Sequence, residues 1–345
     1  MQHWSSLLNF KSLLSHNVLV RFKSCAATNF KLNILFFGTD TFSLRSLISL
    51  ENSTKSNKSK INRIDVVTSF RSKGNPVKKY ADDHGMVCMD WATLKSNTNI
   101  IKHDLGVVVS FGHLIPENII NTFPYGMINV HGSLLPRWRG ASPIIYSILN
   151  EDSVTGVSIM RISPNKFDVG EILAAKSVEI PKNVLMPHLH KTLSNEGATL
   201  LTECIENAPA SFQNGKQQDD NKATYAPKVP ESMATINWQM MTAKYVCNLY
   251  RALYSFKWLT TCWQKRRVKI RDLDLTNDGV NESNLDRSPG YVEYDKINKC
   301  LCVHCSDGHF ISIKKLSVEG KPVMTAADFN NGFLKKVDPK QRYFT

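Results

Sequence analysis

The sequence predicts an α/β protein with a mostly parallel, Rossmann-like N-terminal sheet and a smaller β-rich C-terminal domain. Before residue 210, short apolar runs that suit buried strands alternate with segments of helical periodicity. Past residue 265, strand-like runs recur with turn residues between them, which favours a small barrel. A length of 345 residues fits two domains at about 150 residues each.

Four apolar runs predict the strands of the N-terminal sheet. They cover residues 33–38, 64–68, 105–110 and 127–131. The third run is continuous in apolar and β-branched residues, as in a strand that is buried on both faces. A helix carrying Phe42, Leu44 and Leu47 follows the first run, and another is expected to begin near Val77.

A polar stretch at residues 213–221 separates the two predicted domains. We therefore place a catalytic domain at residues 31–215, a linker at 216–228 and an OB-like β-barrel at 229–345. The barrel strands are expected at residues 267–270, 290–294, 300–304 and 309–316.

Composition and missing motifs exclude several functions. With 42% hydrophobic and 21% charged residues the chain is an ordinary globular protein, and no apolar run approaches the roughly 18 residues of a membrane span. The first strand is not followed by a glycine-rich dinucleotide loop, and the phosphate loop of NTPases does not occur. The nucleophile elbow of serine hydrolases is also missing.

The chain has eight cysteines, most of them scattered. Three of them cluster with a histidine, as Cys300, Cys302, His304 and Cys305. The alternation of a strand would place Cys300, Cys302 and His304 on one face. Structural zinc sites usually need a second, separated ligand pair, and none follows. We expect reduced thiols and no metal.

Residues 1–30 contain no acidic residue, several serines and basic residues, and apolar residues at helical spacing. This is the pattern of a mitochondrial transit peptide, with a disordered tail as the alternative. The net charge of +13 favours a polyanionic partner, of which nucleic acid is the first candidate and a membrane surface the second. The alternative is that the charge serves only solubility.

Two sets of polar residues can carry chemistry. Asn129 and His131 are two apart at the end of a predicted strand, so both side chains lie on one side of the sheet. An amide donor and an imidazole aimed at one point suit a developing oxyanion, although a structural polar pair fits the spacing too. Asp168 lies in a loop before Gly170, either as an ordinary turn residue or as a carboxylate that orients a histidine.

Residues 129–140, together with 168–170, closely resemble the 10-formyltetrahydrofolate-dependent formyltransferases. The similarity extends to residues 36–39 and 108–116. Residues 224–228 and 234–238 resemble the entry to the C-terminal domain of the family members that act on methionyl-tRNA. The short loop at residues 69–75 resembles the mitochondrial forms, whereas bacterial forms carry a longer basic loop there.

This resemblance implies formyl transfer from 10-formyltetrahydrofolate to the α-amino group of methionyl initiator tRNA, inside the mitochondrial matrix. Asn129 and His131 would stabilise the oxyanion, and Asp168 would hold His131 while a proton moves to the folate. The remaining implied residues line a folate pocket or contact tRNA. The folate residues are Ser133, Leu134, Leu135, Pro136, Phe111, Gly112 and Leu114; the tRNA residues are Arg71, Lys73, Lys265, Arg266 and Arg267.

Arg137 and Arg139 are expected to brace their loop. We also expect a monomer that does not engage membranes. Three alternatives stay open: transfer to a sugar or ribotide amine, hydrolysis or oxidation of the formyl group, and RNA binding without catalysis. Preferential binding of methionyl initiator tRNA is expected only of the enzyme that formylates it, and it would separate that enzyme from these alternatives.

Overall fold

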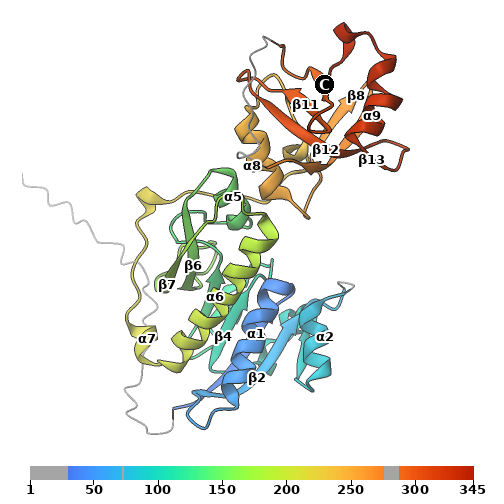
Figure 1. The fold of residues 1–345 in the computed structure, drawn as a ribbon. Coiled ribbons are helices and arrows are strands. Elements are labelled where there is room, and N and C mark those ends of the chain that lie inside the picture. Colours follow the sequence, from blue (N-terminus) through green and yellow to red (C-terminus); the bar gives the residue numbers. More distant parts are fainter. Residues whose placement is uncertain (1–29, 72–73, 276–286) are drawn as a thin grey trace, which may run out of the picture.

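The computed structural model describes residues 30–71, 74–275 and 287–345 (Figure 1). The predicted transit peptide, apart from Phe30, and the predicted tRNA contact Lys73 therefore lie outside the described residues. The described part contains an N-terminal α/β unit and a C-terminal unit built on an antiparallel sheet. This arrangement confirms the predicted fold class.

The N-terminal sheet has seven strands in the order β3-β2-β1-β4-β5-β6-β7. The five strands from β3 to β5 in this order are parallel, whereas β6 and β7 each run antiparallel to their neighbours. The four predicted runs correspond to β1, β2, β4 and β5, whereas β3, β6 and β7 were not predicted. The strands are β1 (Leu32–Gly38), β2 (Ile61–Thr68), β3 (Cys88–Asp90), β4 (Leu105–Val109), β5 (Met127–His131), β6 (Val154–Arg161) and β7 (Ile172–Glu179).

Helices cover both faces of this sheet, and α1 packs along α6 on one of them (Figure 1). Asp40 caps α1 through a reciprocal bond pair with Ser43, which explains why the helix begins directly after the first strand. The α-helices are α1 (Thr41–Thr54), α2 (Pro76–Asp83), α3 (Trp91–Ser96), α4 (Glu117–Ile120), α5 (Pro143–Leu149), α6 (Met186–Glu206) and α7 (Ala210–Gln213).

The C-terminal sheet has the order β10-β11-β12-β9-β8, and β13 pairs with β12. Its helix α8 packs against α5 of the N-terminal unit. The elements are α8 (Ala243–Leu253), β8 (Thr260–Trp263), β9 (Arg266–Leu273), β10 (Val292–Asp295), β11 (Cys300–His304), β12 (Phe310–Val318), β13 (Val323–Thr325) and α9 (Ala326–Gly332). Short 3-10 turns occur at Thr98–Ile100, Asp220–Lys222, Glu231–Ala234, Leu334–Lys336 and Pro339–Gln341.

The end of the chain joins the two outer strands of this sheet. Phe344 bridges Trp263 of β8, and Tyr343 bridges Tyr291 beside β10. The rings of Trp263 and Phe344 pack edge to face with centroids 5.8 Å apart. The last residues therefore close the barrel that the sequence predicts as a run of strands.

In the N-terminal sheet the strand order reverses between β1 and β4, and the loops after these strands meet there. Thr39 donates its hydroxyl hydrogen to the carbonyl oxygen of Ser110 at 3.0 Å. Ligands of open α/β sheets bind outside the carboxyl ends of the strands at such a reversal. The same edge carries the end of β5, where the predicted catalytic pair lies.

No helix in the described part of the chain is long and apolar enough to cross a membrane. The seven cysteines of that part are free thiols.

Candidate active site

The carboxyl end of β5 presents Asn129 and His131 to the same side of the sheet. Ile128 and Val130 alternate with them and point into the core that lies under α1 and α6. His131 is buried, with 6% of its side chain exposed, and Asn129 is half-buried. Among the described residues, none donates or accepts a hydrogen bond at the Asn129 amide. That amide is therefore available to a ligand.

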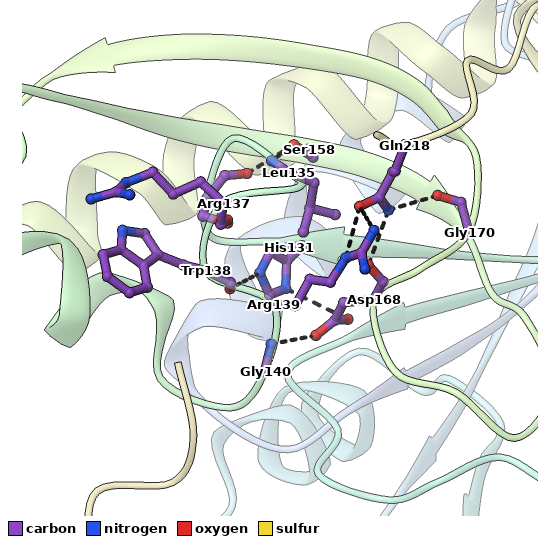
Figure 2. Close-up of polar contacts among 11 residues, drawn as sticks. His131, Leu135, Arg137, Trp138, Arg139, Gly140, Ser158, Asp168, Gly170 and Gln218 are labelled. Atoms are coloured by element: carbon purple, nitrogen blue, oxygen red, sulfur yellow. Dashed lines mark hydrogen bonds and ion pairs between the residues drawn. The ribbon is translucent and has the colours of Figure 1, made fainter. Parts of the chain in front are cut away.

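Contacts with Trp138 and Asp168 orient the imidazole of His131 (Figure 2). Its Nε2 lies 2.9 Å from the carbonyl oxygen of Trp138. Because a carbonyl only accepts, Nε2 carries a hydrogen. Nδ1 lies 3.7 Å from Oδ1 of Asp168, beyond hydrogen-bond length. The two atoms face each other without a direct hydrogen bond.

Asp168 lies in the loop between β6 and β7, and its backbone adopts a left-handed conformation with a φ of 57°. Its Oδ2 accepts a hydrogen bond from the backbone N–H of Gly140 at 2.8 Å. Its Oδ1 points to His131. Of the two alternatives left by the sequence, the geometry favours the carboxylate that orients a histidine.

The loop after β5 is held by a chain of serine hydrogen bonds. The Ser158 hydroxyl donates to the carbonyl oxygen of Ser133 at 2.8 Å and accepts from the backbone N–H of Leu135 at 3.1 Å. The hydroxyl of Ser133 donates to the carbonyl oxygen of Arg137 at 2.6 Å. These bonds fix the loop that follows His131 without using His131 itself.

The predicted folate residues divide by burial. Ser133 and Leu135 are buried, and Leu134 and Pro136 are partly exposed. Phe111 belongs to the core, where its ring meets the ring of Phe37 edge to face at 5.4 Å. Nearby, Leu114 is exposed and Gly112 has a left-handed backbone. The side chain of Phe111 therefore serves packing, and its neighbours present the accessible surface.

Both loop arginines act as braces, as the sequence analysis expected. Arg137 binds Asp152 through its Nε at 2.9 Å and lies 4.2 Å over the ring of Trp138, whose Nε1 donates to the same carboxylate. Arg139 is buried and binds Gln218 and Asp220. A planar guanidinium suits such two-pronged contacts.

The predicted linker segment, residues 216–228, packs against this loop. The backbone N–H of Trp138 donates to the hydroxyl of Thr224 at 2.9 Å, and the backbone N–H of Arg139 donates to the carbonyl oxygen of Thr224 at 2.8 Å. Gly140 has a φ of 122°, and a Cβ on it would lie 2.6 Å from the carbonyl oxygen of Ala226. Only glycine allows this close approach. Sequence reasoning missed these contacts because the segment is merely polar.

The predicted tRNA residues do not form one cluster. Arg71, Lys265 and Arg267 are exposed, whereas Arg266 binds the backbone of Glu319 and lies 6.0 Å from the Phe333 ring. Arg266 and Arg267 are adjacent in β9 and therefore point to opposite faces, while Lys265 precedes the strand, so the three side chains do not share one face.

A basic face of β9 comprises Arg267, Lys269 and Arg271, while Val268 and Ile270 between them point into the core. These three residues line a groove of about 290 Å³ that also contains Glu319 and Lys321. Arg271 lies 4.4 Å from the ring of Trp258, which is 41% exposed. Sequence reasoning missed Trp258, which precedes β8 and carries no motif.

The cysteine cluster lies in and directly after β11 and shows the alternation that the sequence predicts. Leu301, Val303 and Cys305 point into the core. Donor atoms of Cys300, Cys302 and Asp295 lie within 4.8 Å of one another, where a metal ion could be held. Asp295 is the cross-strand partner of Cys300, which the sequence alone does not reveal. The expected absence of a metal stays a prediction.

Comparison with known proteins agrees with the fold and site. Residues 32–205 match the formyl transferase family, and residues 228–334 match the formyl transferase C-terminal domain. The mitochondrial methionyl-tRNA formyltransferase of Homo sapiens is 40% identical over 309 residues, covering 87% of this chain and 77% of the relative. The methionyl-tRNA formyltransferase of Sulfurihydrogenibium sp. is 31% identical, covering 90% of this chain and 100% of the relative.

Among solved structures, the N-formyltransferase of Helicobacter canadensis, determined with folinic acid and dTDP-3-aminofucose, has a TM-score of 0.59. Its identity is 18%, and the match covers 81% of this chain and 98% of that one. This similarity concerns the fold alone.

The fold and the matched domains define the class of protein: the chain belongs to the formyl transferase family. Both curated relatives described above are methionyl-tRNA formyltransferases, so within the family the chain groups with that branch.

Proposed function

We propose that the chain transfers the formyl group of 10-formyltetrahydrofolate to the α-amino group of methionyl initiator tRNA. The observation that carries the proposal is the site at the end of β5. There the amide of Asn129, which has no hydrogen-bond partner in the described part of the chain, lies on the same side of the sheet as an imidazole that faces Asp168 at 3.7 Å. The curated relatives support the choice of acceptor.

The reaction needs a developing oxyanion to be stabilised and a proton to be moved. The amine nitrogen attacks the formyl carbon, and the formyl oxygen becomes negative in the tetrahedral intermediate. Asn129 donates a hydrogen bond to that oxygen, and the imidazolium that forms when Nδ1 of His131 takes the proton of the attacking amine stabilises it electrostatically. When the bond from carbon to N10 of the folate breaks, the proton lost by the amine is delivered to N10 through Nδ1 of His131 and Oδ1 of Asp168.

An amine acceptor explains why no covalent nucleophile is required. Free α-amino groups titrate near pH 7.7–8.0, so a useful fraction is neutral at the pH of the cell. The folate would enter along the loops that follow β4 and β5, where Gly112, Leu114, Leu134 and Pro136 are accessible. Ser133 and Leu135 support that wall from inside.

Acceptor choice is tested by competition. The full chain is supplied with 10-formyltetrahydrofolate and equal concentrations of methionyl-tRNA and a nucleotide-linked amino sugar, and both formylated products are quantified by mass spectrometry. We expect formyl-methionyl-tRNA to dominate. Preferential formylation of the sugar would overturn the proposed acceptor while leaving the proposed site intact.

The basic face of β9 is the proposed tRNA contact of the C-terminal unit, in place of the contiguous run 265–267. Arg267, Lys269 and Arg271 lie side by side on the strand, and Trp258 offers an exposed ring beside them. Such a combination of cations and an aromatic ring suits a nucleic-acid backbone with an unpaired base. In the N-terminal unit, Arg71 remains a candidate contact; Lys73 remains one on sequence grounds alone.

We expect the double variant Arg267→Glu, Lys269→Glu to weaken tRNA binding, with the loss largest at low salt. Each phosphate contact removed lowers the slope of log affinity against log salt by about 0.7–0.9. Filter binding over a series of salt concentrations measures both the affinity and this slope. The control is Lys58→Glu, which makes one such charge reversal at an exposed lysine of the N-terminal unit. An unchanged slope in the double variant would show that tRNA binds elsewhere.

The relatives from Homo sapiens, Rattus norvegicus and Mus musculus are mitochondrial forms. Together with the acid-free first 30 residues, this supports the mitochondrial matrix as the site of action. There the product would be formyl-methionyl-tRNA for initiating protein synthesis.

A further inference from the structure

We infer that Gln218 of the linker segment is a positioning residue, which holds Asp168 in the conformation that aims its carboxylate at His131. This inference rests on the proposed function, since it assigns Gln218 a role in the same reaction. Gln218 lies outside the predicted site residues, and no motif of the sequence analysis includes it.

The amide of Gln218 is fully used by four hydrogen bonds (Figure 2). Its Nε2 donates to the carbonyl oxygens of Asp168 at 3.0 Å and of Gly170 at 2.8 Å. Its Oε1 accepts from Nε of Arg139 at 3.0 Å and from Nη2 at 2.9 Å. A guanidinium only donates and a carbonyl only accepts, so the amide has a single allowed orientation.

The turn at Asp168 needs such support. A φ of 57° is a backbone conformation that residues other than glycine rarely adopt, and it persists where the surroundings impose it. On the other side of the turn, Gly170 lies so close to β6 that a Cβ on it would be 1.9 Å from the carbonyl oxygen of Arg161. The turn is therefore held between β6 and the amide of Gln218.

Arg139 connects this support to the loop after His131. Its side chain is 4% exposed, and besides Gln218 it binds Asp220 at 2.7 Å. The next residue, Gly140, donates its N–H to Oδ2 of Asp168 at 2.8 Å. Asp168 is thus held at two points: its backbone carbonyl is bound by Gln218, and its carboxylate is bound by the N–H of Gly140. Loss of Gln218 frees the carbonyl of Asp168 and removes one of the two sides between which the turn is held, so we expect the turn to shift away from His131.

The test is a double-mutant cycle on the full chain, because a positioning residue acts only through the residue that it positions. Gln218→Ala is expected to lower kcat by about 10- to 100-fold, since small misplacements of catalytic groups have effects of this size. KM for both substrates should change little. In an Asp168→Asn background, Gln218→Ala should cause no further loss.

Two other variants separate positioning from folding. Gln217→Ala is the matched control, since the Gln217 side chain donates to Glu171 at 2.8 Å and not to the Asp168 turn. Gln218→Glu keeps an acceptor for Arg139 but cannot donate to the two carbonyls. We expect Gln218→Glu to lose kcat as Gln218→Ala does, and Gln217→Ala to keep the wild-type value.

A spectroscopic measurement decides the matter without any acceptor. In protein labelled with ¹⁵N-histidine, Gln218→Ala should move the ring resonances of His131 in the same direction as Asp168→Asn, while Gln217→Ala leaves them in place. Two results would overturn the inference. One is that the His131 resonances stay unchanged in Gln218→Ala; the other is that the fold-losses in kcat of Gln218→Ala and Asp168→Asn multiply in the double variant. Failure of the wild type to formylate methionyl-tRNA would instead count against the proposed function, and the resonances would still test Gln218.

Discussion

Replacing Asp168 by asparagine is expected to lower kcat for formyl transfer by about 10²- to 10⁴-fold, the range of general acid–base contributions. The reason is the loss of a carboxylate whose Oδ1 lies 3.7 Å from Nδ1 of His131, with both side chains at least nine-tenths buried. Two unit charges about 4 Å apart interact by about 4 kcal/mol in partly desolvated surroundings. The amide cannot supply this stabilisation to a protonated imidazole. Initial-rate kinetics with saturating folate measure the effect.

The asparagine variant should remain folded, because its amide oxygen can still accept the N–H of Gly140. Asp83→Asn, on the exposed surface of α2, is the control for the loss of one carboxylate. A kcat for Asp168→Asn within a few-fold of the wild type would show that proton movement does not depend on this carboxylate.

Asn129→Ala is expected to lower kcat by about 10²- to 10³-fold, the usual consequence of removing one donor to a developing oxyanion. The Asn129 amide has no hydrogen-bond partner among the described residues, so alanine removes no bond from the folded protein. Stability should therefore change little while the transition state loses a donor. The dissociation constant of the folate should stay near its wild-type value, since the oxyanion forms only during reaction.

The matching control is Asn121→Ala, which removes an exposed amide directly after α4. Single-turnover rates at saturating enzyme separate chemistry from binding. A wild-type single-turnover rate in Asn129→Ala would assign oxyanion stabilisation to another donor.

Sequence reasoning located the fold class and the end of β5 because both depend on local patterns. The apolar run over Met127–His131 specifies a buried strand, and the period of two places Asn129 and His131 on one side. Asp168 was a candidate from the sequence, but only the family resemblance assigned it the catalytic role. Nothing in its own spacing distinguishes a turn residue from a catalytic one.

The contacts that hold the site arise from tertiary approach and leave no local signal. Gln218 lies in a polar stretch that is typical of a linker, yet it meets Arg139 and the Asp168 turn across more than forty residues of chain. The resemblance places Phe111 at the folate pocket through its backbone, and that stays a prediction; the packing of its ring against Phe37 in the core is a tertiary contact that the sequence does not reveal. Barrel closure by Phe344 depends likewise on a distant partner, Trp263.

The basic run at residues 265–267 is contiguous in the sequence, but its side chains do not share one surface in the fold. The turn from β8 into β9 separates the three side chains, and Arg266 is bound to Glu319. The groove follows alternate residues of β9 and takes in Trp258 from the preceding loop.

The most direct test of the central claim measures two quantities on the same samples of wild type, Asn129→Ala and Asp168→Asn. These are the dissociation constant of the folate and the rate at which formyl-methionyl-tRNA forms from 10-formyltetrahydrofolate and methionyl-tRNA. We predict that the wild type forms the product, and that both variants bind the folate normally but form product at least about 10²-fold more slowly. Wild-type rates in both variants would contradict the assignment of the chemistry to the end of β5.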